Sequence, residues 1–392
     1  MKKVLVACDD YVYRVDGKFY FKEFGLDLVK RYLLVFDSVR FAVRVKDMCL
    51  SELGIYNILL EDDRIEVYPI PFFQGPLQFL FKYFFTTQFR LKNIVLNCNV
   101  CVARVPSTVA SIVLYQVMKK KVPYAVEVVA NPKGIMNFEQ KGLYKIVWYF
   151  IHKRLQYECA KADCASYVTQ FGLQKIYPAL KPEHFETFYS SIELNEDFYY
   201  NKRNPKQRRD VFIISHVSHP MKSYLKGHIT VIDTLKKLKE LGYKNVLVKF
   251  AGDGLLKDKF MDYAKMQNVD DQVHFVGLLE KKQLRNFLIE SDLMLFPSHS
   301  EGLPRVLIEA MATSLPCLSS PVDGIPELIS NEYLFHPNDS NGFANKIVEI
   351  MNSDNLYNKM CIENYIKALE YEKSILMIRR KTLYSRLYDK SK

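Results

Sequence analysis

The stretch PSHSEGLPRVLIEAMATSLPCLSSPVDGIPELI, residues 297–329, decides the fold of this chain. It follows an apolar run typical of a buried strand, and it consists of a short polar loop, a helix from Arg305 to Thr313 and a small-residue strand from Leu315 to Ser319. Two strands connected through a helix form a βαβ unit, in which the strands lie parallel in one sheet. The stretch therefore predicts an α/β fold whose ligands bind at the carboxyl ends of the strands.

The same alternation of strands and helices extends outward from this stretch. Further strands of the second half are predicted at Val211–Ile214, Val246–Ala251, Val273–Val276 and Leu293–Phe296, with helices at Ile229–Leu241, Leu255–Met266 and Lys281–Ser291. In the first half, strands are predicted at Val4–Ala7, Val39–Val45, Ile94–Val102 and Tyr124–Val129, with a helix at Phe24–Leu34 and another that Ser107 caps. Each half is thus predicted to be a doubly wound α/β domain.

The two halves are separated by residues 196–209, which show no periodicity and carry five basic residues from Lys202 to Arg209. A chain of 392 residues is also too long for one comfortable core. We therefore predict a first domain over residues 1–195, a linker over 196–209, a second domain over 210–365 and a C-terminal helical segment over 366–392.

The formal net charge of +11 and the pI of about 9.0 indicate an anionic partner. Nucleic acid is the weakest candidate, because the sequence has no zinc finger, RNP motif or arginine-rich arm. The eight cysteines include one isolated CxxC pair, Cys98 and Cys101, and no metal-ligand spacing, so reduced thiols and no metal site are expected. The N-terminal apolar run is too short for a signal peptide, which predicts a cytoplasmic protein.

The loop and helix of residues 301–309 suit a sugar nucleotide. Gly302 lets the backbone approach a ligand closely, and Pro304 favours the first turn of the helix. The amino end of the helix offers unpaired N–H groups and a positive dipole to a diphosphate. Glu301 and Glu309 can each accept hydrogen bonds from pairs of sugar hydroxyls. Either glutamate alone would more often be a solvated side chain, so the whole segment carries the prediction.

The segment SEGLPRVLIEAM resembles the E-x7-E signature of glycosyltransferase family 4. The resemblance implies a GT-B fold, with two Rossmann-like doubly wound domains facing a cleft and the last helix packing back on the first domain. It also implies a retaining, metal-independent transferase with no cofactor and with a nucleotide-diphosphate sugar, favoured as a UDP-sugar, as its substrate. Glu301 would contact the transferred sugar and Glu309 the ribose, while Gly302, Leu303 and Pro304 would present backbone N–H groups.

Three further segments are similar to family elements in order and spacing. FAGDG resembles the turn before the nucleotide, HFVGLLEKKQL resembles the loop that meets the base, and KGH resembles the segment whose lysine binds the diphosphate. The donor-side positions that these segments imply are Gly252, Asp253, Gly254, Val276, Gly277, Leu278 and Lys226.

One position departs from the family pattern, because His216 stands where an arginine is usual. Three explanations stay open: His216 donates to the diphosphate, Lys222 supplies the positive charge, or the correspondence is displaced by the long stretch between Ser218 and Lys226. Together with Lys226, Glu301 is the candidate catalytic residue.

The first half resembles the polysaccharide-building branch of the family through RVPS and VEVVANPKG. The resemblance implies acceptor-side roles for Arg104, Glu127 and Asn131, and for Gly17 in the first loop. An ordinary salt bridge or solvated residue explains Arg104 and Glu127 equally well. The His-Asp pair of many family members is absent, so no catalytic base is assigned.

Two basic, aromatic-rich segments favour contact with a membrane interface. Residues 72–92 have eight aromatic and three basic residues and no acid, and Trp148–Leu155 is similar in character. Burial of the first segment on two sides within the domain is the alternative. Lys82 and Gln78 exclude a comfortable membrane span.

These observations predict transfer of a hexose or N-acetylhexosamine to a glycan acceptor, either free or polyprenyl-linked, in surface polysaccharide or capsule synthesis. The site would lie at the cytoplasmic face of the cell membrane. The alternatives are a GT-B nucleotide-sugar epimerase, a phosphorylase, and a non-catalytic nucleotide-sugar or glycan-binding partner of a synthase complex.

Overall fold

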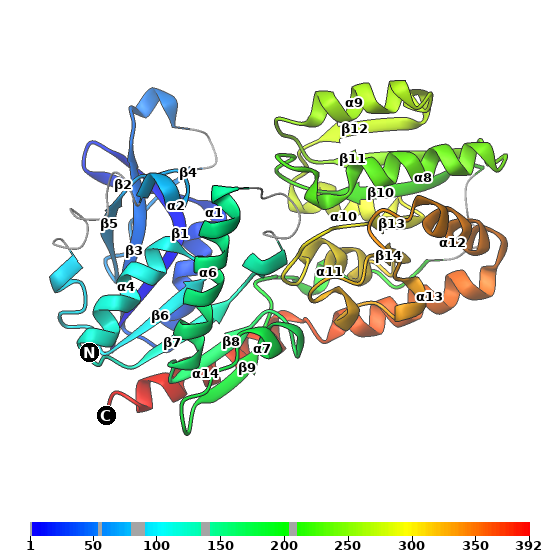
Figure 1. Cartoon of the computed structure of the whole chain (residues 1–392). Coiled ribbons are helices and arrows are strands. Elements are labelled where there is room, and N and C mark those ends of the chain that lie inside the picture. Colours follow the sequence, from blue (N-terminus) through cyan, green and yellow to red (C-terminus); the bar gives the residue numbers. More distant parts are fainter. Residues whose placement is uncertain (1, 54–56, 80–90, 135–141, 204–209) are drawn as a thin grey trace. The chain divides into compact units, whose positions relative to one another are not determined.

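The computed structural model describes residues 2–53, 57–79, 91–134, 142–203 and 210–392, which form two compact units (Figure 1). Of the described residues, 2–53, 57–79, 91–134, 142–189 and 377–392 form unit 1, and 190–203 and 210–376 form unit 2. The α/β class and the two Rossmann-like domains that the sequence predicts are confirmed.

Unit 2 contains a parallel sheet in the order β12-β11-β10-β13-β14. Its strands are β10 (Phe212–Val217), β11 (Val246–Ala251), β12 (Val273–Gly277), β13 (Leu293–Phe296) and β14 (Cys317–Ser319). Its helices are α8 (His228–Glu240), α9 (Lys257–Met266), α10 (Lys281–Ile289), α11 (Arg305–Ala312), α12 (Ser340–Asn352) and α13 (Asp354–Leu369). The strand order reverses between β10 and β13, which is where such sheets bind ligands.

Unit 1 contains a parallel sheet in the order β5-β3-β1-β6-β7-β8-β9, and the antiparallel strands β2 and β4 extend it beside β1. The described strands are β1 (Lys3–Val15), β2 (Lys18–Lys22), β3 (Ser38–Asp47), β4 (Asn57–Leu59), β5 (Ile65–Pro71), β6 (Val100–Val105), β7 (Tyr124–Val128), β8 (Cys164–Tyr167) and β9 (Phe185–Phe188). The described helices are α1 (Glu23–Lys30), α2 (Gly75–Gln78), α4 (Thr108–Lys119), α6 (Leu143–Ala160), α7 (Gly172–Ile176) and α14 (Lys373–Asp389).

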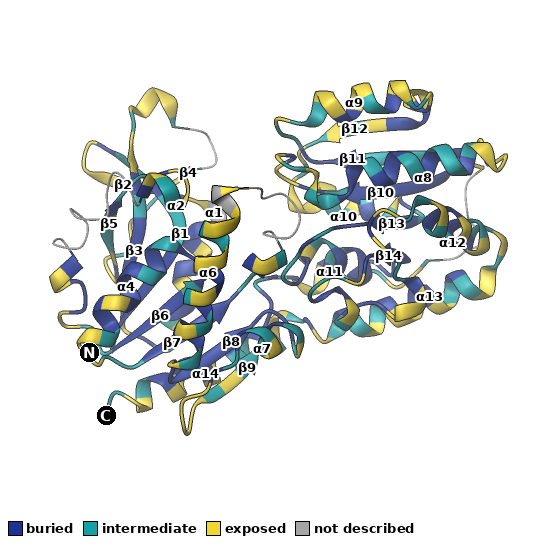
Figure 2. Cartoon of the chain, viewed as in Figure 1, coloured by how far each residue is buried: buried dark blue, intermediate teal, exposed yellow. Residues whose placement is uncertain are grey.

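The central strands of both sheets are buried (Figure 2). All four residues of β13 and all five of β7 are buried, as expected for parallel strands covered on both faces. The predicted cap of α4 is confirmed, since the Ser107 Oγ accepts a 2.9 Å hydrogen bond from the Ala110 N–H.

The first strand is longer than the predicted Val4–Ala7. Strand β1 continues to Val15 and turns at Asp16 and Gly17 into the antiparallel strand β2. Both turn residues have positive φ, 48° and 79°, which is the geometry of a tight hairpin turn with the right twist for its strands. Gly17, predicted on the acceptor side, is therefore the tip of this hairpin.

The predicted linker is in part a packed segment of unit 2. Phe198 is buried, and the Arg203 guanidinium donates to the carbonyl oxygens of Thr313, Ser291 and Leu288 near the carboxyl ends of α11 and α10. A cation is favourable there because helix dipoles are negative at that end. Residues 196–203 are thus held on unit 2, and residues 204–209 lie outside the described part of the chain.

A buried carboxylate ties the C-terminal helix α14 to the sheet of unit 1. Glu127, on β7, receives the hydroxyls of Tyr32, Tyr189 and Tyr384 at 3.0, 2.7 and 2.9 Å, and Arg104 at 2.8 Å. Tyr384 is part of α14, while the other three lie near or on the sheet. Residues 377–392 belong to unit 1 in this way, a shorter segment than the one predicted from residue 366.

This cluster contains the salt bridge that the sequence left open as the alternative to acceptor-side roles for Arg104 and Glu127. Burial raises the pKa of the Glu127 carboxyl, but the Arg104 guanidinium and the three hydroxyl donors outweigh burial and hold the pKa below its ordinary value. Glu127 is 2% exposed and its oxygens are fully used, so it is a structural anion rather than an acceptor ligand.

We predict that Tyr384→Phe lowers the free energy of unfolding by about 1–3 kcal/mol at neutral pH, because a buried carboxylate loses one hydrogen-bond donor. The difference should narrow as the pH falls through the folded-state pKa of Glu127, which lies below 4.5. Chemical denaturation of both proteins across pH measures this.

Tyr388→Phe is the matched control, since this tyrosine is on the same helix and its hydroxyl bonds no described residue. Equal losses in the two variants would contradict the role given to Glu127.

Candidate active site

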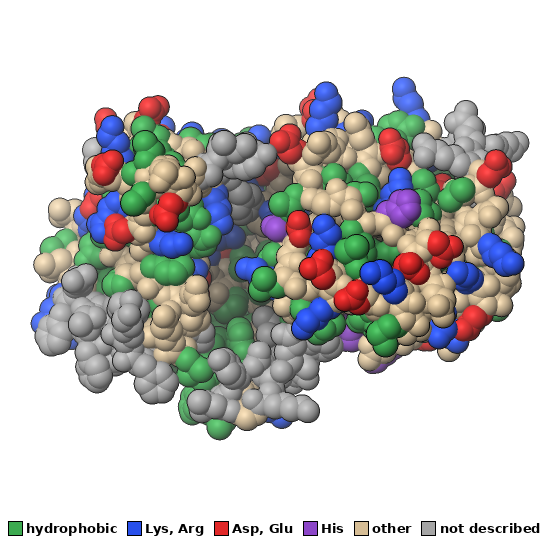
Figure 3. Space-filling model, turned by 90° about the horizontal axis from the view of Figure 1, so that it is seen from above, with side chains coloured by type: hydrophobic (Ala, Val, Ile, Leu, Met, Phe, Trp, Pro, Cys, Tyr) green, Lys and Arg blue, Asp and Glu red, His purple; other side chains and the backbone are tan. Residues whose placement is uncertain are grey.

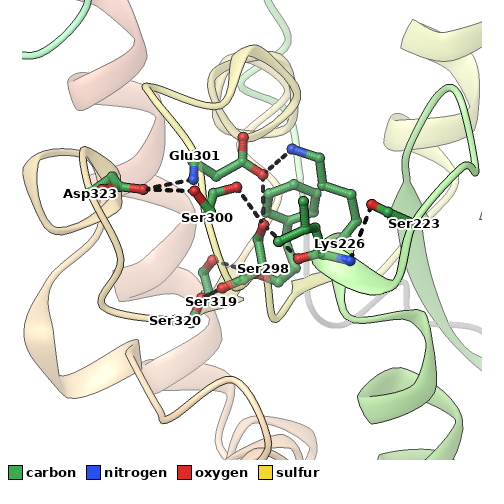
Figure 4. Close-up of polar contacts among 10 residues, drawn as sticks. Ser223, Lys226, Ser298, Ser300, Glu301, Ser319, Ser320 and Asp323 are labelled. Carbon is green, nitrogen blue, oxygen red and sulfur yellow. Dashed lines mark hydrogen bonds and ion pairs between the residues drawn. The ribbon is translucent and has the colours of Figure 1, made fainter. Parts of the chain in front are cut away.

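The carboxyl ends of β10 and β13 bring Lys226 and Glu301 together in unit 2 (Figure 4). The Lys226 Nζ lies 2.5 Å from the Glu301 Oε1. The same oxygen accepts a 2.7 Å hydrogen bond from the Ser298 Oγ. The lysine side chain is 35% exposed and the glutamate 8%, so the pair is open on the lysine side. The two residues predicted to be catalytic, 75 positions apart in the chain, thus form one group.

A close backbone contact sets this arrangement. Gly227 has φ 75° and packs so tightly on Pro297 that an added Cβ would overlap the Pro297 carbonyl oxygen. The backbone also joins the two loops through the His299 N–H, which donates to the Leu225 carbonyl oxygen at 2.7 Å. A residue with a side chain at Gly227 would separate Lys226 from Glu301.

Asp323 holds the Glu301 loop from the other side. Its Oδ2 accepts the Glu301 N–H at 2.8 Å, and the Gly324 N–H donates to the Gly302 carbonyl oxygen at 3.0 Å. Asp323 belongs to the DGIPELI turn, and neither Asp323 nor Ser298 was predicted from the sequence to have a role in the site. The Asp323–Gly324 dipeptide is a turn signal in the sequence that could have identified Asp323, and the structure gives this aspartate the positive φ of such a turn.

The predicted FAGDG turn lies against the loop after β10. Gly252 and Gly254 have φ 131° and 153°, and an added Cβ at either would overlap the backbone of Ser218 or Met221. The Asp253 carbonyl oxygen accepts the Met221 N–H at 2.8 Å, and its Oδ1 accepts the N–H of Gly254 at 2.7 Å. These three residues therefore shape the loop through the backbone.

Glu309 lies half-buried on α11 and forms no hydrogen bond or ion pair with any residue that the structure describes. Burial raises the pKa of its carboxyl, while Arg305 and Lys281 lower it in part. A desolvated carboxylate without a partner is costly unless a ligand supplies donors. Two vicinal hydroxyl groups would supply them.

The remaining donor-side positions are placed as follows. Val276 and Leu278 are 41% and 59% exposed at the end of β12, with the half-buried Gly277 between them at φ 79°. Leu303 is buried, and Pro304 is the N-cap of α11 rather than its first helical residue. Lys222 is exposed in the loop after β10.

His216 does not donate to a diphosphate, because its ring is fully buried. Its Nδ1 lies 2.9 Å from the Leu295 carbonyl oxygen, and its ring is 4.5 Å from that of His228 and 5.6 Å from that of Phe296. Burial lowers the pKa of His216 to about 4. Two of the explanations left open above remain: Lys222 supplies the positive charge, or the correspondence with the family pattern is displaced. If it is displaced, the exposed His219 in the loop after β10 is another candidate for the position.

On the acceptor side, the structure does not gather the four predicted residues into one site. Arg104 and Glu127 pair in the buried cluster, and Gly17 forms a hairpin tip. Asn131 is buried, and its Oδ1 accepts the Tyr177 hydroxyl at 3.0 Å and the Lys133 N–H at 3.1 Å.

The described part of the chain holds no group of three or more histidine, cysteine, aspartate or glutamate side chains that could bind a metal ion. The cysteines are free, and burial raises the pKa of the Cys101 and Cys98 thiols.

Comparison with known proteins now identifies unit 2. Residues 201–367 match the family model described as "Glycosyl transferases group 1". These residues are thus similar to a group 1 glycosyltransferase domain. This domain contains Lys226, Glu301 and Glu309, and its switch point is the site described above.

Relatives extend the similarity beyond the group 1 glycosyltransferase domain. Protein CapJ of Staphylococcus aureus is 28% identical over 374 residues, which cover 95% of this chain and 90% of CapJ. An Escherichia coli enzyme named UDP-Gal:alpha-D-GlcNAc-diphosphoundecaprenol alpha-1,3-galactosyltransferase is 29% identical over 130 residues, 32% of this chain and 33% of that protein.

The fold is shared with HepE of Anabaena in its complex with UDP, at a TM-score of 0.69 and 16% identity, over 98% of this chain and all of that one. The predicted GT-B fold is confirmed, and the chain is a glycosyltransferase of that fold.

We predict that acid destabilises unit 2 through its two buried histidines. His216 and His228 are fully buried, and no described residue bonds either nitrogen of His228. Burial lowers both pKa values from 6.5, so the unfolded chain binds more protons and stability falls as the pH drops from about 6.5 towards about 4. The slope can reach about 1.4 kcal/mol per pH unit for each histidine.

His228→Phe should flatten this dependence, since the ring already stacks on Phe260 at 4.3 Å. Denaturant unfolding at several pH values measures it, with His274→Gln, at an exposed position on β12, as control. An unchanged slope in His228→Phe would show that the acid sensitivity arises elsewhere.

Proposed function

We propose that this chain is a retaining, metal-independent glycosyltransferase that moves a hexose or N-acetylhexosamine from a UDP-sugar to a glycan acceptor. The observation that carries the proposal is the Lys226–Glu301 pair at the switch point of the sheet in unit 2, with the unpartnered Glu309 on the helix that follows in the chain. The acceptor that we favour is a polyprenyl-linked glycan in surface polysaccharide or capsule synthesis.

The nucleotide and the diphosphate of the donor would be bound by different groups of residues. The Glu309 carboxylate would accept hydrogen bonds from the ribose hydroxyls, and the backbone at Val276, Gly277 and Leu278 would meet the base. The amino end of α11 and the Lys226 ammonium would receive the diphosphate. UDP is favoured because the relative from E. coli is named for a UDP-sugar and HepE binds UDP.

The chemistry needs stabilisation of the departing diphosphate. Lys226 and the N–H groups at the start of α11 supply fixed positive charge and dipoles at the point where negative charge develops. Glu301 would hold the transferred sugar through its hydroxyls, and the Ser298 Oγ and the Asp323 carboxylate keep Glu301 in place. The leaving phosphate would take the acceptor proton at the same face, so the configuration is retained.

Contact with a membrane is a further part of the function that we propose. The E. coli relative is named for a diphosphoundecaprenol-linked acceptor. Most of the aromatic segment 72–92 lies outside the described residues, since residues 80–90 are not described. No helix in the described part of the chain is long and apolar enough to cross a membrane. We propose peripheral contact at the cytoplasmic face.

We predict that one UDP-sugar yields a glycosylated product and that Glu301→Gln lowers kcat by about 100-fold or more, because an interaction that positions the reacting sugar is lost. The assay measures transfer from UDP-glucose, UDP-galactose and UDP-N-acetylglucosamine to GlcNAc-diphosphoundecaprenol, and NMR determines the anomeric configuration of the product. Glu290→Gln, an exposed glutamate at the end of α10, is the control.

The same assay with a chelator should proceed at an unchanged rate, since fixed groups rather than a metal ion neutralise the diphosphate. Loss of activity with the chelator, or inversion at the anomeric carbon, would contradict the mechanism. UDP binding without transfer to any acceptor would favour the non-catalytic partner instead.

A further inference from the structure

Helix α6 of unit 1 carries an exposed aromatic and basic face. Ile146, Tyr149, Phe150 and Tyr157 are 53%, 48%, 65% and 45% exposed, at spacings that place them along one side of the helix. Lys145 and Lys153 are exposed in the same segment, and the one acid of the helix, Glu158, is buried. Large apolar side chains exposed together, with basic neighbours, are unusual on a surface that faces water alone.

The carboxyl end of α6 opens into a hollow of about 1020 Å³ that we name the basic hollow. Six basic side chains and one acid line it. The basic residues are Lys119, Lys121, Arg154, Lys161, Lys181 and Lys390. They come from segments far apart in the chain, and all of them belong to unit 1.

Much of this positive charge is not neutralised within the protein. Lys181 pairs with Asp163, Arg154 pairs with Glu158 at 2.7 Å, and Lys390 pairs with Glu183 at 3.9 Å. Lys119, Lys121 and Lys161 form no ion pair with any residue in the described ranges. By contrast, acidic and basic side chains are interspersed on the face of unit 2 seen in Figure 3. Like charges gathered in one hollow repel one another, and a bound anion would relieve this repulsion.

Helix dipoles explain part of the basic hollow but not all of it. Lys119 lies in the last turn of α4 and Lys161 is the C-cap of α6, where a cation is favourable. Lys390 directly follows α14, where the same holds, but Lys181 is at no helix end, and the dipole gives no reason for the exposed aromatic side chains. A ligand with both an anionic group and an apolar part would account for the unpaired lysines and for the exposed aromatic side chains.

The basic hollow also adjoins an apolar pocket. Arg154 lines the hollow and a second pocket of about 430 Å³, which Val147, Trp148, Phe150 and Ile151 of α6 line on one side. One helix therefore presents apolar and cationic sites in succession. Ligands that need both are lipids with anionic headgroups at a membrane surface.

We propose that the outer face of α6 and the basic hollow form a docking surface for the anionic phospholipids of a membrane. The lysines bind the phosphate groups, and the aromatic side chains of α6 enter the boundary between headgroups and acyl chains. This inference rests on the proposed function, because the docking surface would make the peripheral membrane contact proposed above. Its residues are remote in sequence from the donor-side residues of unit 2.

The test is flotation of the full chain with vesicles of phosphatidylglycerol and phosphatidylcholine, and with vesicles of phosphatidylcholine alone. We expect binding to the anionic vesicles, reversed by salt. The triple variant Lys119→Glu, Lys121→Glu, Lys161→Glu should lower the partition coefficient about 100-fold or more, given roughly fivefold for each lysine charge near an anionic surface. Phe150→Ser should lower it with the charge unchanged.

The matched control is the variant Lys244→Glu, Lys259→Glu, Lys282→Glu, which makes the same change in net charge at exposed positions of unit 2. Full binding by the control and lost binding by the hollow variant would support the proposal. Equal binding by all three proteins, equal loss in both triple variants, or no preference of the wild type for anionic vesicles would overturn it.

Isothermal titration calorimetry of UDP binding by the same variants distinguishes failure of the docking surface from failure of the proposed donor site. The donor site is in unit 2, so the hollow variant should bind UDP as the wild type does. Retained UDP binding with lost flotation supports the docking surface, and failure of UDP binding in the wild type would instead reject the donor site.

Discussion

The close approach of Gly227 to the Pro297 carbonyl is the constraint on which the donor site depends. It lets the loop after β10 meet the loop after β13 without an intervening side chain. The ion pair between Lys226 and Glu301, and the hydrogen bond from Ser298, follow from that contact. A parallel sheet delivers both loops to one edge, but only a glycine with a left-handed backbone lets them touch.

A second constraint acts in unit 1. Glu127 is an anion in the core, and its partners come from β6, the helical turn after α1, the chain after β9, and α14. Removing a donor leaves a buried charge underpaired, which is costly, whereas the complete cluster fixes where the C-terminal helix packs. The cluster around Glu127, which stabilises the core of unit 1, is therefore distinct from the residues of unit 2 that we expect to contact the donor.

The sequence predicted unit 2 better than unit 1, for physical reasons. Strand β13 is a short apolar run buried on both faces, and a continuous apolar run bounded by polar residues identifies such a strand directly. The hairpin at Asp16–Gly17 was missed, although an Asp-Gly turn between two strands is a strong signal of a hairpin. The sequence could not show that Arg104 and Glu127 are buried together, nor that His216 points into the core, since burial depends on packing between distant segments.

The measurement that tests the central claim most directly is calorimetric titration of the full chain with UDP, for the wild type and Glu309→Gln. The account predicts that the wild type binds and that the variant binds about 10- to 100-fold more weakly, as expected for loss of charge-assisted hydrogen bonds to ribose. Equal affinity in both proteins, or no binding by the wild type at millimolar UDP, would contradict the donor site described here.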